Sequence, residues 1–315
     1  MDNSNKKSGR LFWGILISLI LIVLIFVGIS FMILASKIIT SGDKDYYLES
    51  SGSGEGKIAI VDLDFTIISS EPIVRQFKKF REDKSIKAIV LHINSPGGGV
   101  AASQEMYEEV KKTRDSGKPV IVSFGSIAAS GGYYTACGGS LIVSNPGSLT
   151  GSIGVIAQFM SVRELADKLG IKYTTVKSGE LKDAGSPFRD INQKDIIYFQ
   201  DIIDDSYDQF LDVVSKERKI DKETLKPIAS GRVYTGKQAK ELKLVDTIGT
   251  FQDAIKIAAD MVGIKGEPTL VREKSKRGVL DLFFESSTAR ELKEIKEEFK
   301  TEFLNTPVLQ YKFEK

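Results

Sequence analysis

The residue with the clearest chemical potential is Ser130, which stands between two alanines and two glycines in the sequence AASGGYY. Small neighbours of this kind leave a serine hydroxyl group accessible to a substrate carbonyl. Residues 126–136 also predict a helix that begins near this serine, where free backbone N–H groups and the helix dipole stabilise a developing negative charge. Ser126 and Ser95 are alternative nucleophiles, and a packing contact between small side chains is the non-catalytic interpretation of the same pattern.

A base that would activate such a serine has to come from elsewhere in the chain, because a serine hydroxyl is a weak nucleophile until a neighbouring group takes its proton. The only histidine, His92, lies in the alternating strand pattern AIVLHI, which favours a structural role. A lysine is therefore the favoured base, and residues 177–189 (KSGELKDAGSPFR) contain Lys177 and Lys182. An exposed lysine has a pKa of about 10.4. We therefore expect burial to lower the pKa of the base by about 3, and the rate to rise with pH through the lowered value.

A glycine-rich turn follows the predicted strand that ends at Ile93. Its sequence, NSPGGG at residues 94–99, presents backbone N–H groups that can hold an anion or an oxyanion, although a purely structural turn is the alternative. The turn lacks the GxxxxGK[ST] spacing of a nucleotide-binding P-loop. Of the 28 glycines, 12 lie in residues 94–154. Such clustering at strand ends is typical of an active site in an α/β fold.

The composition excludes several other kinds of site. The chain of 315 residues has one cysteine, Cys137, and one histidine, so it can form neither an internal disulfide nor a cysteine-rich zinc site. The net charge of +2 disfavours a nucleic-acid partner. Charged residues make up 27% and hydrophobic residues 42%, which is ordinary for a globular protein. We therefore expect no metal, no cofactor and no nucleic acid.

The N-terminal residues predict a single membrane anchor. Residues 11–36 carry no charge, and as a helix they are long enough to cross a hydrocarbon core about 30 Å thick. Basic residues precede this stretch, so the positive-inside rule places residues 1–10 in the cytoplasm and the rest of the chain outside it. A cleaved signal peptide is the alternative, but its apolar region is usually only about 7–15 residues long. Residues 37–56 are rich in serine and glycine and predict a flexible linker.

The rest of the chain alternates between strand and helix patterns, which predicts a layered α/β fold with mainly parallel strands over residues 57–270. Strands are expected at residues 57–65, 87–93, 119–124, 140–143, 153–157 and 172–176. Helices are expected at residues 71–84, 100–113, 161–169, 193–219, 235–243 and 251–262, besides the one within 126–136. Residues 271–315 are predicted to be a C-terminal tail whose amphipathic helix, 288–303, docks on a neighbour.

Several of these motifs occur together and in a characteristic order. NSPGGG, AASGGYY, GSIGV, SGELKDAGSPFR and the downstream GRVYTGKQAKELKLVD resemble the signal peptide peptidase A family in its short, single-domain form. The resemblance covers residues 57–262, and the predicted anchor stands where this family has one. It implies the Clp protease/crotonase-like α/β fold, a spiral of ββα units, here with an N-terminal transmembrane helix.

The resemblance also implies roles for individual residues. It implies that Ser130 is the nucleophile, that Lys182 is the general base and that Ser152, in TGSIGV, orients the lysine. The backbone N–H groups of Gly97 and Gly131 are the implied oxyanion donors. It implies no metal or cofactor. Members of the family are further expected to form ring-like homo-oligomers in which a central chamber excludes folded proteins.

One departure from the family pattern is Lys243, in ELKLVD, where a glycine is usual near the end of a helix. If this position requires a positive φ angle, the lysine costs about 1 kcal/mol of stability. His92 also stands where another polar residue is common in the family. Neither difference affects the implied active site.

Together these observations predict a membrane-anchored serine endopeptidase with a dyad of Ser130 and Lys182. Its catalytic domain would face outward from the cell membrane and degrade signal peptide remnants and other unfolded or membrane-released peptides. Because the motif glycines leave shallow pockets, small or apolar side chains are expected beside the cut bond. The alternatives are a catalytically inactive membrane scaffold of the same fold and a crotonase-like acyl-CoA enzyme. An alanine or a glycine at position 130 or 182 would have favoured the scaffold.

Overall fold

The computed structural model describes residues 46–275 and 310–312. Of these, residues 48–273 and 310–312 belong to one compact unit, and residues 46–47 and 274–275 belong to another.

Two of the predicted elements lie outside the described residues. These are the membrane anchor, residues 11–36, and the amphipathic tail helix, residues 288–303. Within the described part of the chain, no helix combines the length and the apolar character needed to span a bilayer.

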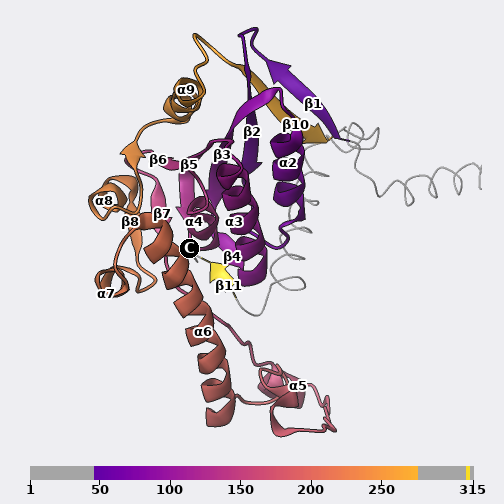
Figure 1. The fold of residues 1–315 in the computed structure, drawn as a ribbon. Coiled ribbons are helices and arrows are strands. Elements are labelled where there is room, and N and C mark those ends of the chain that lie inside the picture. Colours follow the sequence, from indigo (N-terminus) through magenta and orange to yellow (C-terminus); the bar gives the residue numbers. More distant parts are fainter. Residues whose placement is uncertain (1–45, 276–309, 313–315) are drawn as a thin grey trace, which may run out of the picture. The chain divides into compact units, whose positions relative to one another are not determined.

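The described residues are organised around a nine-stranded sheet (Figure 1). Its strands are β1 (Tyr46–Ser51), β2 (Lys57–Leu63), β3 (Ile86–Ser95), β5 (Val120–Ala129), β6 (Leu141–Ser144), β7 (Leu149–Gly151), β8 (Val233–Thr235), β9 (Thr247–Ile248) and β10 (Thr269–Ser275). The main path runs in the order β1-β10-β2-β3-β5-β6-β9, and the neighbours from β10 to β9 pair in parallel. β7 extends the sheet at the C-terminal end of β5, and β8 pairs with β7 antiparallel.

Helices cover both faces of this sheet, because alternate strand residues are buried in two different layers. Ile60 of β2 belongs to a layer that packs on α9 (Phe251–Met261). Val61, the next residue, belongs to the larger core, which packs on helices of the opposite face. The remaining helices are α2 (Glu71–Glu82), α3 (Val100–Asp115), α4 (Gly131–Ala136), α5 (Arg163–Lys168), η1 (Glu180–Asp183), α6 (Gln193–Arg218), α7 (Lys222–Leu225), η2 (Lys226–Ile228) and α8 (Gly236–Glu241).

The long helix α6 follows a segment that we call the arm, residues 157–192, which contains α5 and η1. Figure 1 shows α5 near the N-terminal end of α6, while the C-terminal half of α6 lies beside the sheet. A capping box defines the start of α6, since the Asn192 side chain accepts the N–H groups of Lys194 and Asp195. The helix ends at Arg218, and the residue that follows, Lys219, has a left-handed φ angle of 53°.

Most of the predicted helices and strands are present, and the structure differs from the prediction in the four ranges described next. The helix within 126–136 begins only at Gly131, because β5 continues to Ala129. Residues 172–176 alternate like a strand but have no regular structure, and Val176 is 96% exposed, so the alternation is not matched by burial. Residues 153–157 contribute only an isolated bridge at Ile156. Tyr46–Ser51 forms a strand inside the range predicted as a flexible linker.

Candidate active site

Ser130 occupies the sharp turn between β5 and α4. Its φ of 53° and ψ of −116° fall in a region that residues with a side chain rarely adopt. Its own N–H group holds the turn by donating to the Gly151 carbonyl at 2.8 Å. The side chain is 1% exposed, and its Oγ atom has no hydrogen-bond partner among the described residues. A hydroxyl group that is unpaired and held in a strained turn is a candidate for chemistry.

The glycine turn forms a short strand, β4 (Gly97–Gly99), with two distinct edges. On one edge, the Gly97 carbonyl accepts the Ile67 N–H at 2.8 Å and the Gly99 N–H donates to the Ile67 carbonyl at 2.7 Å. In a strand, the N–H and C=O groups of one residue point to the same edge and those of the next residue point to the opposite edge, so both groups of Gly98 face the other edge. The Gly97 N–H, an expected oxyanion donor, instead donates to Ser95 Oγ at 3.2 Å.

The chain's own C-terminal segment lies along this second edge of β4. β11 (Gln310–Lys312) pairs antiparallel with β4, and Tyr311 stands opposite Gly98. On the other edge of β11, Gln310 and Ile156 exchange backbone hydrogen bonds of 3.0 and 3.1 Å. An extended segment is therefore held between two backbone segments, as when a peptide adds a strand to a sheet. A part of the predicted tail thus belongs to the candidate site.

The Tyr311 carbonyl group lies among the glycines of the site. Its oxygen is 2.1 Å from the position that a Cβ atom on Gly97 would occupy and 3.1 Å from the equivalent position on Gly131. Gly131 directly follows Ser130, and the Gly98 nitrogen lies 3.2 Å from the same position on Gly131. A peptide carbonyl thus lies beside the candidate nucleophile, next to backbone N–H groups that can stabilise charge on its oxygen.

The Tyr311 side chain is fully buried in an aromatic pocket. Its ring stacks on Tyr134 with 5.2 Å between centroids, and its centroid lies 4.6 Å from that of Phe210. Its hydroxyl group donates to the Ser206 carbonyl of α6 at 2.9 Å. Burial raises the pKa of Tyr311, so the phenol remains a hydrogen-bond donor. The pocket accommodates a large aromatic side chain.

Ser152 lies next in the chain to the residue that holds the Ser130 turn. Ser152 follows Gly151, the residue whose carbonyl accepts the Ser130 N–H. Its φ of 49° is also left-handed, and its N–H donates to the Arg232 carbonyl at 2.9 Å. Together with Tyr207 it lines a pocket of about 460 Å³.

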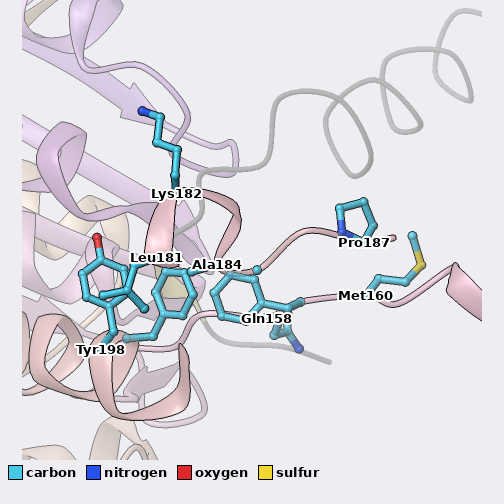
Figure 2. Close-up of a pocket in the computed structure, with 10 residues that line it drawn as sticks. Gln158, Met160, Leu181, Lys182, Ala184, Pro187 and Tyr198 are labelled. Carbon is cyan, nitrogen blue, oxygen red and sulfur yellow. The ribbon is translucent and has the colours of Figure 1, made fainter. Parts of the chain in front are cut away.

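Within one chain, Lys182 makes no hydrogen bond with Ser130, whose Oγ atom has no partner among the described residues. Lys182 is exposed on η1 of the arm and lines a different pocket, of about 570 Å³, near Phe199 of α6. Figure 2 shows its amine directed away from the aromatic side chains of that pocket. α6 reaches the Ser130 side at Phe210, whose ring lies 4.9 Å from that of Tyr134. Ile203 and Tyr207 of the same helix line the pocket that contains Ser152, and Lys182 is not among the residues of that pocket.

The alternative nucleophiles and the alternative base have other surroundings. The Ser95 hydroxyl group is buried and donates to the Phe65 carbonyl at 2.5 Å, so it supports the turn. Ser126 is exposed within β5, four residues before the strained turn. Lys177 lies 2.7 Å from a carboxylate oxygen of Asp183.

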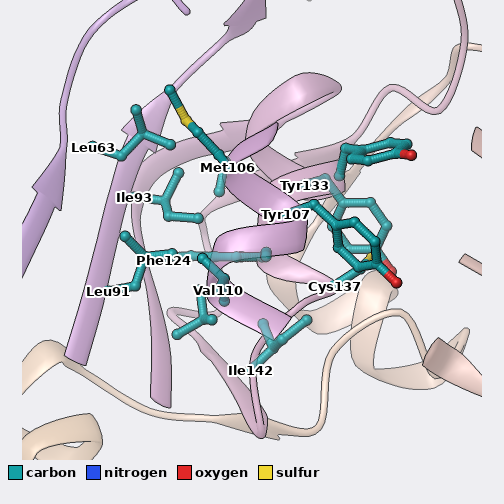
Figure 3. Close-up of a cluster of buried hydrophobic side chains, with 14 of the residues drawn as sticks. Leu63, Leu91, Ile93, Met106, Tyr107, Val110, Phe124, Tyr133, Cys137 and Ile142 are labelled. Carbon is teal, nitrogen blue, oxygen red and sulfur yellow. The ribbon is translucent and has the colours of Figure 1, made fainter. Parts of the chain in front are cut away.

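His92 and Cys137 occupy packed positions. The His92 ring lies 4.8 Å from that of Phe251 of α9, and burial lowers its pKa. Cys137 is 3% exposed within the cluster shown in Figure 3, and burial raises its pKa to about 12. Both observations fit structural roles. Among the described residues, no group of His, Cys, Asp or Glu side chains is placed to hold a metal ion.

Reasoning from the sequence missed both the C-terminal strand and the pocket that receives Tyr311. The signal that could have found the strand is the alternation of Leu309, Tyr311 and Phe313, a period of two at the end of the chain. The pocket has no comparable signal, because Tyr134 and Phe210 come from two helices that are far apart in the sequence.

Comparison with known proteins finds similarity to proteases. The family model of peptidase family S49 matches residues 112–265, and that of Clp protease matches residues 58–146. The chain is 41% identical over 209 residues to the putative protease slr0021 of Synechocystis sp., a match that covers 66% of this chain and 75% of that protein.

Two further relatives extend well beyond the region that matches this chain. The chain is 41% identical over 180 residues to the putative signal peptide peptidase SppA of Enterococcus faecium, which covers 57% of this chain and 52% of that protein. It is 36% identical over 215 residues to Protease 4 of Haemophilus influenzae, which covers 65% of this chain and 35% of that protein. The chain thus spans about half or less of these two relatives.

Proposed function

Because this chain belongs to peptidase family S49, we propose that it is a membrane-anchored serine endopeptidase with Ser130 as nucleophile and Lys182 as general base. The position of β11 carries this proposal. The Tyr311 carbonyl lies beside Ser130 and against Gly97 and Gly131, where the carbonyl group of a bond to be cut would have to lie. β11 therefore indicates how an extended peptide substrate binds.

In the proposed mechanism, Ser130 Oγ attacks the carbonyl carbon of the substrate residue that takes the place of Tyr311, while Lys182 accepts the hydroxyl proton. The C–N bond then breaks, and Lys182 gives the proton to the leaving amine, which leaves an acyl-enzyme ester on Ser130. Water next attacks the ester, with the lysine again taking a proton. This step releases the N-terminal peptide fragment and restores the serine.

The negative charge on the carbonyl oxygen requires two backbone donors. Gly131 supplies one, because its N–H lies at the start of α4 directly after the nucleophile. Gly98 is proposed as the other in place of Gly97, since the Gly97 N–H is used by Ser95 Oγ. The polar groups of Gly98 face the edge on which β11 binds.

The general base is proposed to reach Ser130 from a second copy of the chain. Two observations support this: Lys182 is exposed on the arm, and Ser130 Oγ lacks a partner among the described residues. The arm also exposes large apolar side chains, including Leu169 at 66% and Val176 at 96%, which suit a contact between copies. A ring-like homo-oligomer would repeat this contact at each site.

The proposed substrates are extended peptides that are released outside the cytoplasm or from the membrane, including signal peptide remnants. Backbone pairing on both edges of β11 supports this class, because a folded protein offers no free strand for such pairing. Residues 11–36 would anchor the catalytic domain at the outer side of the cell membrane. The aromatic pocket favours a tyrosine before the cut bond.

The test uses a peptide with the chain's own sequence VLQYKFEK, residues 308–315, and the full-length protein in detergent micelles. Ser130→Ala and Lys182→Ala are each expected to lower kcat by at least about 1000-fold, since either change disables proton transfer from the nucleophile. Ser126→Ala and Lys168→Ala are matched controls, because both residues are exposed and lie outside the proposed site. Mass spectrometry is expected to find the cut after the tyrosine.

Thermal unfolding of each variant shows whether it is folded. Cleavage that survives in Ser130→Ala or in Lys182→Ala, with folding retained, overturns the role of that residue. A folded wild-type protein that cuts neither this peptide nor unfolded casein overturns the enzymatic proposal and favours the inactive scaffold.

A further inference from the structure

We propose that Arg189 is the positioning residue of the general base: held between Asp183 and Asp195, it fixes the turn that carries Lys182 at the N-terminal end of α6. This inference rests on the proposed role of Lys182 and adds what holds that residue in place. A reacting group that is misplaced by about 1 Å can lose about 100-fold in rate. The base therefore needs a rigid support.

Regular secondary structure gives the Lys182 turn little support. η1 is a 3-10 helix of 4 residues. Residues 171–179 before it and 184–192 after it contain neither a strand nor an α-helix. Lys182 itself is exposed. Interactions between side chains must therefore set the orientation of the turn.

Arg189 connects the turn to α6 through two carboxylates. Its guanidinium group donates to both oxygens of Asp195, at 2.5 and 2.9 Å. Its Nη2 atom also lies 3.0 Å from Oδ1 of Asp183, the residue that directly follows Lys182. A planar guanidinium group can bind two carboxylates in this way, whereas the ammonium group of a lysine cannot reproduce the paired geometry.

We call Arg189 and the two carboxylates that it binds the clamp. At Asp195, this clamp is fixed to the start of α6. The Asp195 carboxylate accepts the Asn192 N–H at 3.1 Å, and the Asn192 side chain accepts the Asp195 N–H at 3.1 Å. The Asp195 side chain is 1% exposed, and its hydrogen bonds with Arg189 are the main cause that lowers its pKa to about 2. The capping box and the clamp share one carboxylate, so the turn is tied to an ordered helix end.

The charges around Asp183 also affect the base. An uncompensated carboxylate beside Lys182 would favour its protonated form. Lys177 and Arg189 both bind Asp183 and hold its pKa below the usual value. The other carboxylate of the turn, Glu180, has a partner of its own in Lys194 at 2.8 Å. Loss of Arg189 would leave Asp183 less compensated, so activity should then require a higher pH.

The test compares Arg189→Lys and Arg189→Met with Arg163→Met in the full-length protein. Arg163 is a matched control, because it is another arm arginine that pairs with Asp190 and has no described contact with the Lys182 turn. We expect kcat to fall about 10- to 100-fold in both Arg189 variants. KM should stay within about twofold of wild type, because the groups that bind β11 are unchanged. Arg163→Met should keep wild-type kcat within about twofold.

The pH profile separates positioning from general damage. The pH of half-maximal kcat is expected to rise by about one unit in Arg189→Met and to stay unchanged in Arg189→Lys, which retains the charge. Adding Asp183→Asn to Arg189→Met removes the uncompensated carboxylate, so this double variant should recover the wild-type pH profile but not the wild-type kcat. Partial unfolding would lower kcat equally at every pH and would also lower the thermal unfolding temperature.

The same series distinguishes failure of this inference from failure of the proposed function. If Lys182→Ala retains activity, the proposed base is wrong and the role of Arg189 is overturned with it. If Lys182→Ala is inactive while both Arg189 variants behave like Arg163→Met, only the positioning role is overturned. Identical pH profiles for Arg189→Met and Arg189→Lys also contradict the inference.

Discussion

The backbone carbonyl oxygen of Tyr311 lies 2.1 Å from the position that a Cβ atom on Gly97 would occupy. No side chain can stand there while a peptide carbonyl group is bound. Gly97 also has a φ of 97°, which residues with a side chain rarely adopt. The Gly131 nitrogen lies 2.6 Å from the same Cβ position. Glycine is therefore needed at this position for the backbone conformation, for the close approach of Gly131 and for the close approach of the bound peptide.

Gly97→Ala is expected to abolish cleavage of the VLQYKFEK peptide, whereas Gly117→Ala is expected to retain it. Gly117 has a similar φ of 89°, but an added Cβ atom would meet nothing within 4 Å. The control therefore carries only the conformational cost, about 1 kcal/mol of stability. Steady-state kcat/KM and thermal unfolding of both variants provide the measurement. Equal loss of activity in the two would mean that backbone strain, and not peptide approach, explains the effect.

The aromatic pocket predicts an order of preference for the residue before the cut bond. A peptide with phenylalanine in place of tyrosine loses the hydrogen bond to the Ser206 carbonyl, worth about 1 kcal/mol, so kcat/KM should fall about fivefold. A peptide with alanine also loses the contacts with Tyr134 and Phe210, and its kcat/KM should fall on the order of 100-fold. Equal kcat/KM for the tyrosine and alanine peptides would contradict the assignment of this pocket.

Lys243 adopts a φ of 61°, which confirms that the position where the family has a glycine requires a left-handed residue. Lys243→Gly is therefore expected to raise the free energy of unfolding by about 1 kcal/mol and the midpoint temperature by about 2–4 °C. Lys216→Gly is the matched control, because Lys216 is exposed within α6 and glycine should destabilise a helix there by about 1 kcal/mol. Destabilisation by both substitutions, seen in thermal unfolding, would refute the strain at Lys243.

The lowered pKa of Asp195 predicts that the stability of the folded protein depends on pH in the acidic range. Its pKa is lowered to about 2 from 3.8 by the hydrogen bonds with Arg189. A carboxylate with a lowered pKa in the folded state stabilises that state fully above its unfolded pKa, and the contribution is lost as the pH falls toward the folded value. The difference in unfolding temperature between wild type and Asp195→Asn should therefore shrink between about pH 5 and pH 2. A constant difference over this range would show that the ionised carboxylate contributes nothing.

Alternation and helical spacing predicted most of the fold because they report burial. Residues 87–93 alternate between two buried layers, and β3 is found there. Residues 172–176 alternate as well, yet Val176 is 96% exposed and no strand forms. A local sequence pattern carries no information about whether a neighbouring strand is available for pairing. For this reason, the strand predicted at 172–176 was wrong.

The candidate site was likewise only partly predictable from the sequence. Ser130 and Ser152 lie in turns whose small neighbours mark them in the sequence, and the Ser130 N–H donates to the carbonyl of Gly151, the residue before Ser152. Tyr311 reaches Gly98 across more than two hundred residues, and no local spacing encodes such a pairing. The arrangement of Lys182 in the arm is equally non-local, because it depends on where α6 directs the arm and on what the arm then contacts.

The most direct test of the central claim, that Ser130 and Lys182 act together from different copies, is co-expression of full-length Ser130→Ala with full-length Lys182→Ala. Each variant alone should be inactive. In a randomly mixed oligomer, a site is complete only when its serine comes from a Lys182→Ala copy and its lysine from a Ser130→Ala copy, which gives about one quarter of wild-type kcat per site. Recovery of cleavage near that value is the predicted result. A mixed oligomer as inactive as either variant alone would contradict the account.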